Sequence, residues 1–500
     1  MNYIKSYTYG KGNSWFPYSK LPFFIGLFFC SILFLQCKKS TTTTSSSAKL
    51  GFSANLLFFD TVFTTQGSTV RVFVVRNNNN QAINISSIKL AGTYTSPFKI
   101  NVDGVASSSF SNIKIPANDS IYVFATVNVN PGNPQNPAFI RDSLVFMTNG
   151  NEQYVDLWAF GWDAYYYVPN VFPPIGPAYS VLPCSGGTVE WKNDKPHVVF
   201  GYLADTTPGC TFLIDAGTQV FLHDSAVIFI GNGAAINVAG TKAKPVTFQG
   251  DRLEPDYKYL PGQWNKIWLS AGSTNNNISW AVIQNGSIGV EADTNGTSYY
   301  TLKMDHTIIK GMSSYGLLGA GATIKLNNCV IADCQSACAA MFYGGNYHFY
   351  QCTFADYWGV DNSFGQRGTS LIYINNGYTS YANVPQPRSI DSAFFGNCII
   401  YGPLDEEVGL DSAYNAKFNY NFQNCVIKTL HNTFGPSYHY STSNWINGDP
   451  LFYNPAIDDY HVSGGSPALN NGDPIIGAAY KIDLDGTTRG PTYTIGAYQQ

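Results

Sequence analysis

Charged side chains are scarce in this chain of 500 residues, because Asp, Glu, Lys and Arg together make up only 12% of it. So low a fraction is atypical of a highly charged cytosolic enzyme or of a disordered chain. The net charge is −4 and the pI is about 6.0. With no basic surplus to neutralise phosphate backbones, nucleic acid is not an expected partner.

Several catalytic motifs are also missing. No Ser-His-Asp constellation, P-loop or dinucleotide fingerprint stands out. Hydrolases of the polygalacturonase kind carry a Gly-His-Gly and an Arg-Ile-Lys element, and neither occurs here. These absences disfavour classical polysaccharide hydrolysis and nucleotide chemistry.

The chain has no apolar run of comfortable transmembrane length. The longest near the amino terminus, Leu21 to Leu35, has fifteen residues and is followed by Cys37 and a Lys- and Ser/Thr-rich stretch to Ser47. This order resembles a bacterial lipoprotein signal, although Gln36 departs from the small residue that the family places before the Cys. The resemblance implies lipidation of Cys37 and anchoring in the cell envelope, on an outer-membrane side that the sequence leaves open.

Aromatic residues, by contrast, reach 15% of the chain, and Gly is abundant with 47 copies. This composition is typical of an extracellular β protein. Within it, one phrase recurs: an amide, a small residue, a β-branched residue and an aliphatic or aromatic one. The copies are Asn328-Cys329-Val330-Ile331, Gln351-Cys352-Thr353-Phe354, Asn397-Cys398-Ile399-Ile400 and Asn424-Cys425-Val426-Ile427, with Asp305-His306-Thr307-Ile308 as a fainter one.

The spacing of the phrase predicts a solenoid. His306, Cys329 and Cys352 follow one another at intervals of 23 residues. In a parallel β-helix, successive coils lie about 4.8 Å apart, so equivalent residues form columns. We expect the Cys and the residue two later to point inward, the β-branched residue to point outward, and the amide to sit at a corner and hydrogen-bond up its column.

Two later intervals, of 46 and 27 residues, break this period. We interpret the longer one as a single coil with inserted loops, because Asp361–Gly368 and Asn375–Arg388 are rich in turn residues. Loops that project from a rigid rod are the expected place for function.

The segment from Leu50 to about Asp163 shows short alternating strands without this period. With Gly92, Ser96-Pro97-Phe98 and Thr148-Asn149-Gly150 it resembles small immunoglobulin-like domains of envelope and ciliary proteins, which implies a β-sandwich that acts as a spacer or docking module.

The remainder resembles right-handed β-helix lipoproteins of the pectin-lyase-like kind. The resemblance covers roughly Cys184 to Tyr498. It is carried by Gly217-Thr218, Gly240-Thr241, Lys244 to Gly250, Ile278 to Ile283, Asp449-Pro450-Leu451-Phe452, Asp483 to Gly486 and Ile495 to Tyr498. It implies a rod closed at its end by a C-terminal cap, since the last coil would otherwise expose unpaired backbone.

We therefore predict an all-β protein, an Ig-like sandwich followed by a right-handed parallel β-helix with a C-terminal cap. The expected segments are a lipoprotein signal (1–37), a tether (38–49), the sandwich (50–165), a Pro-rich connector (166–183), the β-helix (184–445) and the cap (446–500).

The envelope is oxidising, so Cys184 and Cys210 are a candidate disulfide, whereas the repeated thiols are expected in the core. Cys334 and Cys338 lack a nearby His or acid cluster, so no zinc site is predicted. Two carboxylates, Asp483 and Asp485, are too few to predict a calcium site. No cofactor is expected, and Ca²⁺ is the one metal ion left open.

Candidate catalytic residues are confined to one loop-like acidic run, Asp405, Glu406, Glu407 and Asp411. The run of Lys303 to His306 faintly resembles a pectate-lyase element, but Asp305 and His306 coincide with the repeat columns and are interpreted as corner and core residues. Trp264, Trp268 and Trp358 are candidate glycan contacts, because exposed rings stack against sugar faces.

The preferred function is non-catalytic binding or adhesion to an extended polymer, with polysaccharide as the expected partner besides the membrane. A polysaccharide lyase or hydrolase with a non-standard acidic site is one alternative, and a purely structural envelope component is the other.

Overall fold

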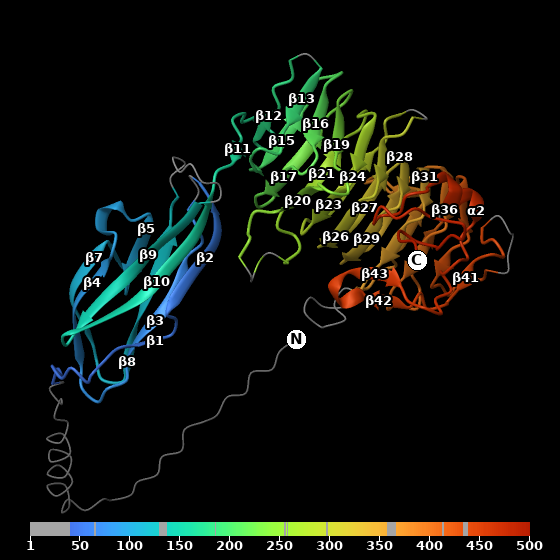
Figure 1. Ribbon diagram of the computed structural model, residues 1–500. Helices are drawn as coiled ribbons and strands as arrows, with labels where there is room; N and C mark the ends of the chain where they lie inside the picture. Colours follow the sequence, from blue (N-terminus) through green and yellow to red (C-terminus); the bar gives the residue numbers. More distant parts are fainter. Residues whose placement is uncertain are drawn as a thin grey trace, which may run out of the picture. The chain divides into compact units, whose positions relative to one another are not determined.

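The computed structural model describes residues 41–500 except 65–66, 130–137, 186, 255–256, 258, 297–298, 358–366, 413–414 and 434–438. Almost every regular element is a strand (Figure 1). Within the described residues, no helix combines the length and apolarity of a membrane span. The chain divides into two compact units. Among the described residues, one unit comprises those of 41–57, 69–126 and 141–157, and the other those of 58–68, 127–140 and 158–500.

The amino-terminal strands form a β-sandwich of two five-stranded sheets, as predicted. One sheet has the order β1 (Gly51–Phe52), β3 (Arg71–Asn77), β8 (Asp119–Val127), β5 (Phe98–Val102), β6 (Val105–Ser107). The other has the order β2 (Leu56–Phe63), β10 (Asn151–Trp162), β9 (Ala138–Thr148), β4 (Ile83–Leu90), β7 (Ser109–Ile115). A 3-10 turn, η1 (Thr93–Thr95), follows β4. Buried and exposed residues alternate along β8, which places one face of the strand in the core.

The rest of the chain is a parallel β-helix with three long sheets, here called sheets I, II and III. Sheet I contains β11 (Tyr165–Tyr167), β14 (His197–Val199), β17 (Gln219–Leu222), β20 (Val246–Gly250), β23 (Ala281–Gln284), β26 (Ile308–Met312), β29 (Val330–Cys334), β32 (Thr353–Ala355), β37 (Ile399–Tyr401), β40 (Val426–Ile427) and β41 (Trp445–Ile446). Sheet II contains β12 (Tyr179–Val181), β15 (Tyr202–Asp205), β18 (Val227–Ile230), β21 (Lys266–Leu269), β24 (Ile288–Asp293), β27 (Tyr315–Ala320), β30 (Ala337–Phe342), β33 (Ile372–Asn375) and β38 (Val408–Asp411). Sheet III contains β13 (Thr188–Trp191), β16 (Thr211–Asp215), β19 (Ala235–Ala239), β22 (Asn276–Ser279), β25 (Leu302–Asp305), β28 (Thr323–Asn327), β31 (Gly345–Tyr350), β36 (Ile390–Gly396) and β39 (Phe418–Gln423).

The four clear copies of the repeated phrase form the predicted columns. The fainter copy was placed wrongly by one residue: Ile308 pairs with Val330, so His306, with φ of 44°, takes the left-handed corner position of Asn328 and not the core position of Cys329. Val330 pairs with Thr353, Thr353 with Ile399, and Ile399 with Val426, so the interval of 46 residues is one coil with inserted loops. The thiols that precede these residues are all fully buried: Cys329, Cys352, Cys398 and Cys425. The backbone N–H of Cys398 donates to the Sγ of Cys425 at 3.3 Å, which shows direct stacking between neighbouring coils.

The amide column occupies a left-handed corner between sheets III and I. Asn328, Gln351, Asn397 and Asn424 have φ of 49°, 52°, 54° and 49°. Asn tolerates this conformation better than most L residues, which explains its recurrence at the corner. The side chains of Asn328, Asn397 and Asn424 bond to Arg489, Asp473 and Asn471 of the C-terminal segment. The expected bonding up the column occurs at one step, where the amide oxygen of Gln351 accepts from Asn397 Nδ2 at 3.1 Å.

The β-helix begins earlier than predicted. β11 and β12 pair with later strands of sheets I and II, yet both lie at 165–181, largely within the stretch expected to be a Pro-rich connector. The prolines of this stretch lie in the turns outside β11 and β12. Strands as short as these are difficult to recognise in a Pro-rich sequence.

The C-terminal segment lies along the side of the β-helix, against the outer face of sheet I, whereas the sequence placed it at the end of the rod. It contains β42 (Phe452–Asn454), η2 (Pro455–Ile457), β43 (Asp459–Val462) and α2 (Pro474–Ala479). Its Tyr460, Leu484 and Ala497 pack on Val330, Ala332 and Ala355, which are outward-facing apolar residues of sheet I. Covering this apolar face removes it from water, which explains the lateral course.

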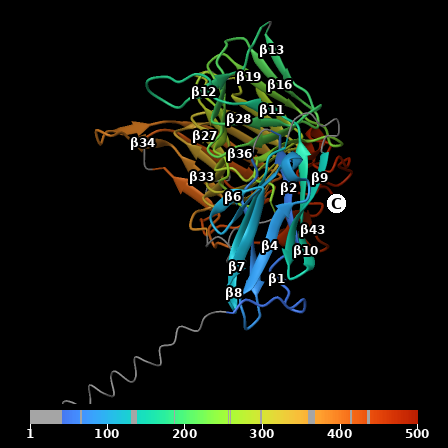
Figure 2. The same cartoon turned by 90° about the vertical axis from the view of Figure 1, so that its left-hand side faces the viewer.

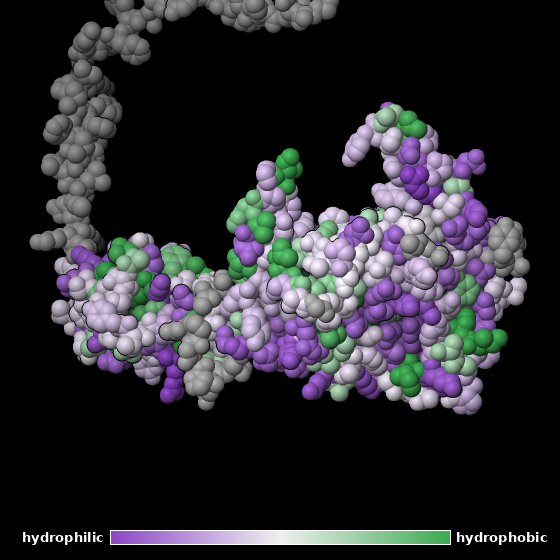
Figure 3. Space-filling model, turned by 90° about the horizontal axis from the view of Figure 1, so that it is seen from above, coloured by the Kyte–Doolittle hydropathy of each residue, from purple (hydrophilic) through white to green (hydrophobic). Residues whose placement is uncertain are grey.

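The inserted loop at Asn375–Arg388 contains a two-stranded hairpin, β34 (Gly377–Thr379) and β35 (Pro385–Pro387). It projects from the side of the β-helix (Figure 2). In the space-filling view the surface of the β-helix is largely hydrophilic or intermediate in hydropathy, and apolar residues form small separate groups (Figure 3).

Candidate functional site

The outer face of sheet II carries a row of side chains one coil apart. Trp268 pairs with Glu291, Glu291 with Leu318, Leu318 with Ala340, and Ala340 with Tyr373. Four steps of about 4.8 Å place Trp268 and Tyr373 about 19 Å apart along the rod. The face is therefore long enough to contact several units of an extended polymer.

Five rings form a continuous cluster at one end of this face, which we call the aromatic patch. Its members are Tyr315, Phe342, Tyr343, Tyr373 and Tyr378. Ring centroids lie 5.8 Å apart for Tyr315 and Phe342, and 5.5 Å apart for Phe342 and Tyr373. Tyr343 lies 5.7 Å from Phe342 and 5.0 Å from Tyr378 of the hairpin. Tyr343 and Tyr378 are 43% and 36% exposed, so these two rings are open to a ligand.

A hollow of about 680 Å³ lies beside the patch. Tyr343 and Arg388 belong to its lining, and the Arg388 guanidinium also lies 5.5 Å from the ring centroid of Tyr378. Thr294, Asn346 and Asp391 also line the hollow, and they offer a hydroxyl, an amide and a carboxylate group. Rings next to convergent polar groups are the arrangement that sugars require, since a sugar has an apolar face and a hydroxyl rim.

Of the four predicted acids, Asp411 is the one that lies against the aromatic patch. Its Oδ2 accepts hydrogen bonds from the hydroxyl of Tyr373 at 3.1 Å and from the amide of Asn375 at 2.8 Å. Tyr373 packs over Gly409, where an added Cβ would meet the ring at 2.9 Å. This glycine leaves room for the ring to lie flat against the next coil.

The other three acids do not converge with Asp411 on one site. Glu407 is fully buried, and its carboxylate accepts two bonds from Arg367 Nη2, at 2.8 and 2.7 Å. Burial raises the pKa of Glu407, and the neighbouring Arg367 opposes this shift. Glu406 accepts bonds from the Thr429 hydroxyl and the Leu430 backbone N–H, both at 2.9 Å, and Asp405 is exposed. Glu407 thus holds the coil together and cannot reach a substrate.

The pairing of Arg367 with Glu407 was not predicted from the sequence. Arg367 lies at the end of a segment that we expected to be a surface loop, yet its side chain is buried between Glu407 and Asp356. The distance from Arg367 Nε to Asp356 Oδ2 is 3.2 Å. No local pattern links these residues, because Asp356 and Arg367 lie at the two ends of the inserted loop after β32, and Glu407 lies in the corresponding connection of the next coil.

The three tryptophans predicted to contact glycan lie in different places. Trp264 was expected to contact glycan, but it is fully buried, and its indole N–H donates to the Gln284 carbonyl at 2.9 Å. It belongs to the core because it points inward over Gly286, whose missing side chain makes room for the ring. Trp268 is half-buried on the outer face of sheet II and bonds to Asp293 at 2.9 Å. Trp358 lies outside the described residues.

The predicted disulfide is present, and the repeated thiols are not part of it. Cys184 and Cys210 form a disulfide with Cα atoms 6.3 Å apart, and Cys37 lies outside the described residues. Cys334 and Cys338 are free, buried thiols whose pKa is raised by burial. Asp483 accepts bonds from the backbone of Thr487 and Gln499. In the described part of the chain, no three His, Cys, Asp or Glu side chains are grouped to hold a metal ion.

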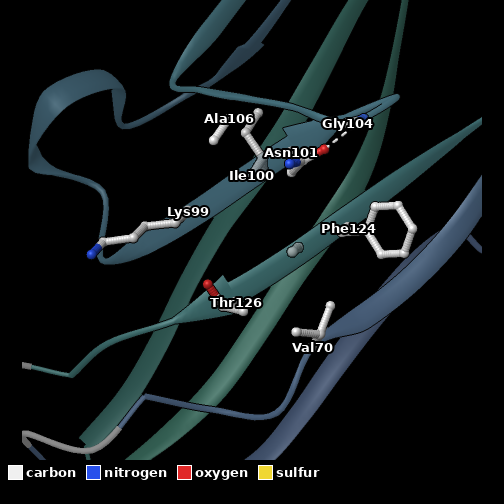
Figure 4. A pocket seen from close by; sticks show the side chains of 9 residues that line it. Val70, Lys99, Ile100, Asn101, Gly104, Ala106, Phe124 and Thr126 are labelled. Carbon is white, nitrogen blue, oxygen red and sulfur yellow. Dashed lines mark hydrogen bonds between the residues drawn. The ribbon is translucent and has the colours of Figure 1, made fainter.

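The sandwich has a hollow of its own, of about 420 Å³, on the sheet that contains β5 and β8 (Figure 4). Val70, Ile100 and Phe124 line it, and the amide oxygen of Asn101 is used by the backbone N–H of Gly104 at 2.9 Å. Its walls are mainly apolar, with Lys99 and Thr126 as polar members, so it offers a contact surface.

No family model matches this chain, and no curated protein matches it. Among solved structures, it is similar to the Agl-KA catalytic domain, at 10% identity over 71% of this chain and 75% of that one, with a TM-score of 0.30. It is also similar to the catalytic unit of a GH87 alpha-1,3-glucanase from Streptomyces thermodiastaticus, at 9% identity over 75% and 89%, with a TM-score of 0.27. A family 123 glycoside hydrolase from Clostridium perfringens matches at 10% identity and a TM-score of 0.18, and this chain covers 30% of its length. These TM-scores are too low for any of the likenesses to carry an argument, so the architecture rests on the strand pairing described above.

Proposed function

We propose that this protein is an envelope lipoprotein that binds a polysaccharide chain along the outer face of sheet II. The observation that carries the proposal is the aromatic patch, which joins rings from three coils and the projecting hairpin into one surface beside a polar hollow. Stacking against Tyr343 and Tyr378 supplies contact area, and the polar groups of the hollow supply hydrogen bonds to hydroxyls.

Binding of uncharged glucans and other neutral glycans, measured by affinity electrophoresis, tests this proposal. We expect Y343A/Y378A to weaken binding of the preferred glycan at least about tenfold, because stacked rings dominate such interfaces. The control Y94A/Y453A removes two exposed tyrosines elsewhere, which are 94% and 73% exposed, and is expected to bind like the wild type. Equal loss in both variants, or no glycan binding at all, would contradict the proposal.

A polysaccharide lyase or hydrolase acting at the same face is the second candidate. The observation that favours it is Asp411, a carboxylate hydrogen-bonded to Tyr373 within the aromatic patch. Cleavage products released by the wild type and lost in D411N would support this alternative over simple binding. In the first candidate, no products form and D411N still binds.

Anchoring through a lipidated Cys37 is the remaining part of the proposal, supported by the signal-like order of the first 47 residues. The full-length chain is expected in the membrane fraction and labelled by a fatty-acid probe. The C37S variant should lose the label. A wild-type chain that takes up no label would contradict lipidation.

A further inference from the structure

The outer face of sheet III carries a second surface, which shares none of the residues of the aromatic patch. Lys303 of β25 pairs with Lys325 of β28, and Lys325 pairs with His348 of β31. Neighbouring coils are about 4.8 Å apart, so these side chains form one column. Burial and the neighbouring Lys325 lower the pKa of His348, so the positive charge of the column rests on the two lysines. We call it the lysine column.

The two ammonium groups lie beside tyrosine rings. Lys303 Nζ is 5.2 Å from the ring centroid of Tyr300. Lys325 Nζ is 5.8 Å from that of Tyr350 and 5.4 Å from that of Tyr480, and these two rings are themselves stacked with centroids 5.0 Å apart. The rings hold the ammonium groups in place through cation–π contacts and still leave their charge uncompensated.

Nearby carboxylates do not neutralise the column. Asp305 is bonded to Ser279 and His306, both at 2.6 Å. Asp473 accepts bonds from Gln423 and from the backbone at the start of α2. Within the part of the chain that the structure describes, no carboxylate oxygen lies within 4.0 Å of the Nζ of Lys303 or Lys325. Two cations thus stand unpaired on a protein whose net charge is −4.

A hollow of about 320 Å³ continues the surface beyond the column. His348, Ser392 and Gln423 give it polar groups, while Tyr350 and Phe394 give it rings. Asp473 also lines it, with its carboxylate taken up by Gln423 and the backbone at the start of α2. The Nδ1 atom of His348 is buried and has no hydrogen-bond partner among the described residues. An occupant of the hollow must therefore offer hydrogen-bonding groups such as hydroxyls.

We propose that the lysine column binds an anionic sugar polymer, that is, a glycan with a carboxylate, sulfate or phosphate on successive units. Repeated negative charge matches cations that repeat from coil to coil, and the apolar faces of sugars match the rings of Tyr350 and Tyr480. The surface goes beyond the proposed function, because its ligand class and its residues differ from those of the aromatic patch.

Binding of four immobilised polymers to the full chain tests this inference: polygalacturonate, dextran sulfate, uncharged dextran and a single-stranded oligonucleotide. At low ionic strength we expect K303Q/K325Q to lose at least about tenfold in affinity for one of the two charged glycans, together with most of the salt dependence of its binding. Polygalacturonate and dextran sulfate distinguish carboxylate from ester groups. The variant K49Q/K89Q removes two exposed lysines of the sandwich and should bind like the wild type.

Three results would overturn the inference. One is a wild-type protein that binds charged glycans no better than dextran, and another is an equal loss in the two lysine variants. The third is an oligonucleotide that binds as tightly as the best charged glycan, because this would indicate a general polyanion surface. Since Y343A/Y378A leaves the lysine column intact, failure here is separable from failure of the proposed function.

Discussion

Single residues at the corner between sheets III and I show why Asn recurs in the repeated phrase. Asn397 has φ of 54°, its side-chain oxygen accepts from the Asp473 N–H at 2.7 Å, and its amide donates to the Asp473 carbonyl at 3.1 Å. The residue therefore does two things at once: it adopts a left-handed conformation and it fastens the C-terminal segment.

The two contributions of Asn397 can be separated by substitution. We expect N397A to lower the free energy of unfolding by about 2–3 kcal/mol, because it loses the hydrogen bonds and strains a left-handed backbone. The variant N397G keeps the backbone conformation accessible and should lose only part of this amount. Urea unfolding of both variants measures the difference, and equal stability of the two would show that the backbone conformation is unimportant.

The buried Arg367 pairs with both Glu407 and Asp356. The R367M variant leaves Glu407 and Asp356 buried without their cation, so we expect a loss of about 3–5 kcal/mol in the free energy of unfolding. Lys192 provides an exposed control, since its pair with Glu190 is at 3.5 Å and the two side chains are 67% and 41% exposed. K192M should cost less than about 1 kcal/mol. Similar losses in the two variants, read from the same denaturant curves, would contradict the burial argument.

Among the elements, the C-terminal segment is held to sheet I partly through a buried acid. Asp333 of β29 accepts from the Tyr460 hydroxyl at 2.8 Å and from the Tyr357 N–H at 2.9 Å. Burial, followed by the charge of Asp356, raises the pKa of Asp333 to about 8. Asp458, which is paired with Lys310 at 2.6 Å, also faces this carboxyl group.

This pKa predicts a pH dependence with a definite sign. An ordinary Asp in the unfolded chain has a pKa of about 3.9, so from there up to about 8 the folded state binds the additional proton. Stability therefore falls as pH rises through this window and levels off above it. In D333N this loss is absent, so the Tm of D333N relative to the wild type should increase between those pH values. A difference in Tm that stays constant with pH would contradict the assignment.

His461 of β43 also makes the stability of the fold depend on pH, with the same sign as Asp333. Burial acts to lower its pKa, but hydrogen bonds to Asp459 at 2.6 Å and Asp485 at 2.8 Å outweigh burial and raise it. The stabilisation is present below the ordinary pKa of about 6.5 and is lost as pH rises through the raised value. We expect H461Q to remove this loss above pH ~6.5 while leaving the effect of Asp333 in place, as thermal melts at several pH values will show.

For the whole molecule, the sequence predicted the architecture but not the surfaces. The thiol and amide columns could be found because their members recur in one phrase, and the 23 residues from Cys329 to Cys352 are the length of one coil. Lys303, Lys325 and His348 also follow this period, at 22 and 23 residues, so the lysine column was detectable in principle. The aromatic patch was not, because the hairpin that brings Tyr378 to Tyr343 interrupts the repeat.

The course of the C-terminal segment was hidden for a different reason. Val330, Ile399 and Val426 face outward, and β-branched residues are ordinary on an exposed sheet face, so the sequence did not indicate that they would be covered. The position of Arg367 was equally hidden, since a buried cation within a turn-rich segment is recognised only once its two carboxylates are brought together.

The central claim is that the fold assembles a glycan-binding face from residues of separate coils. Amide hydrogen exchange of the full chain, with and without a saturating neutral glycan selected by affinity electrophoresis, tests it most directly. We predict that protection increases in β30, β33 and the β34–β35 hairpin and stays unchanged in the sandwich. Protection confined to the sandwich, or none in those strands despite bound glycan, would contradict the account.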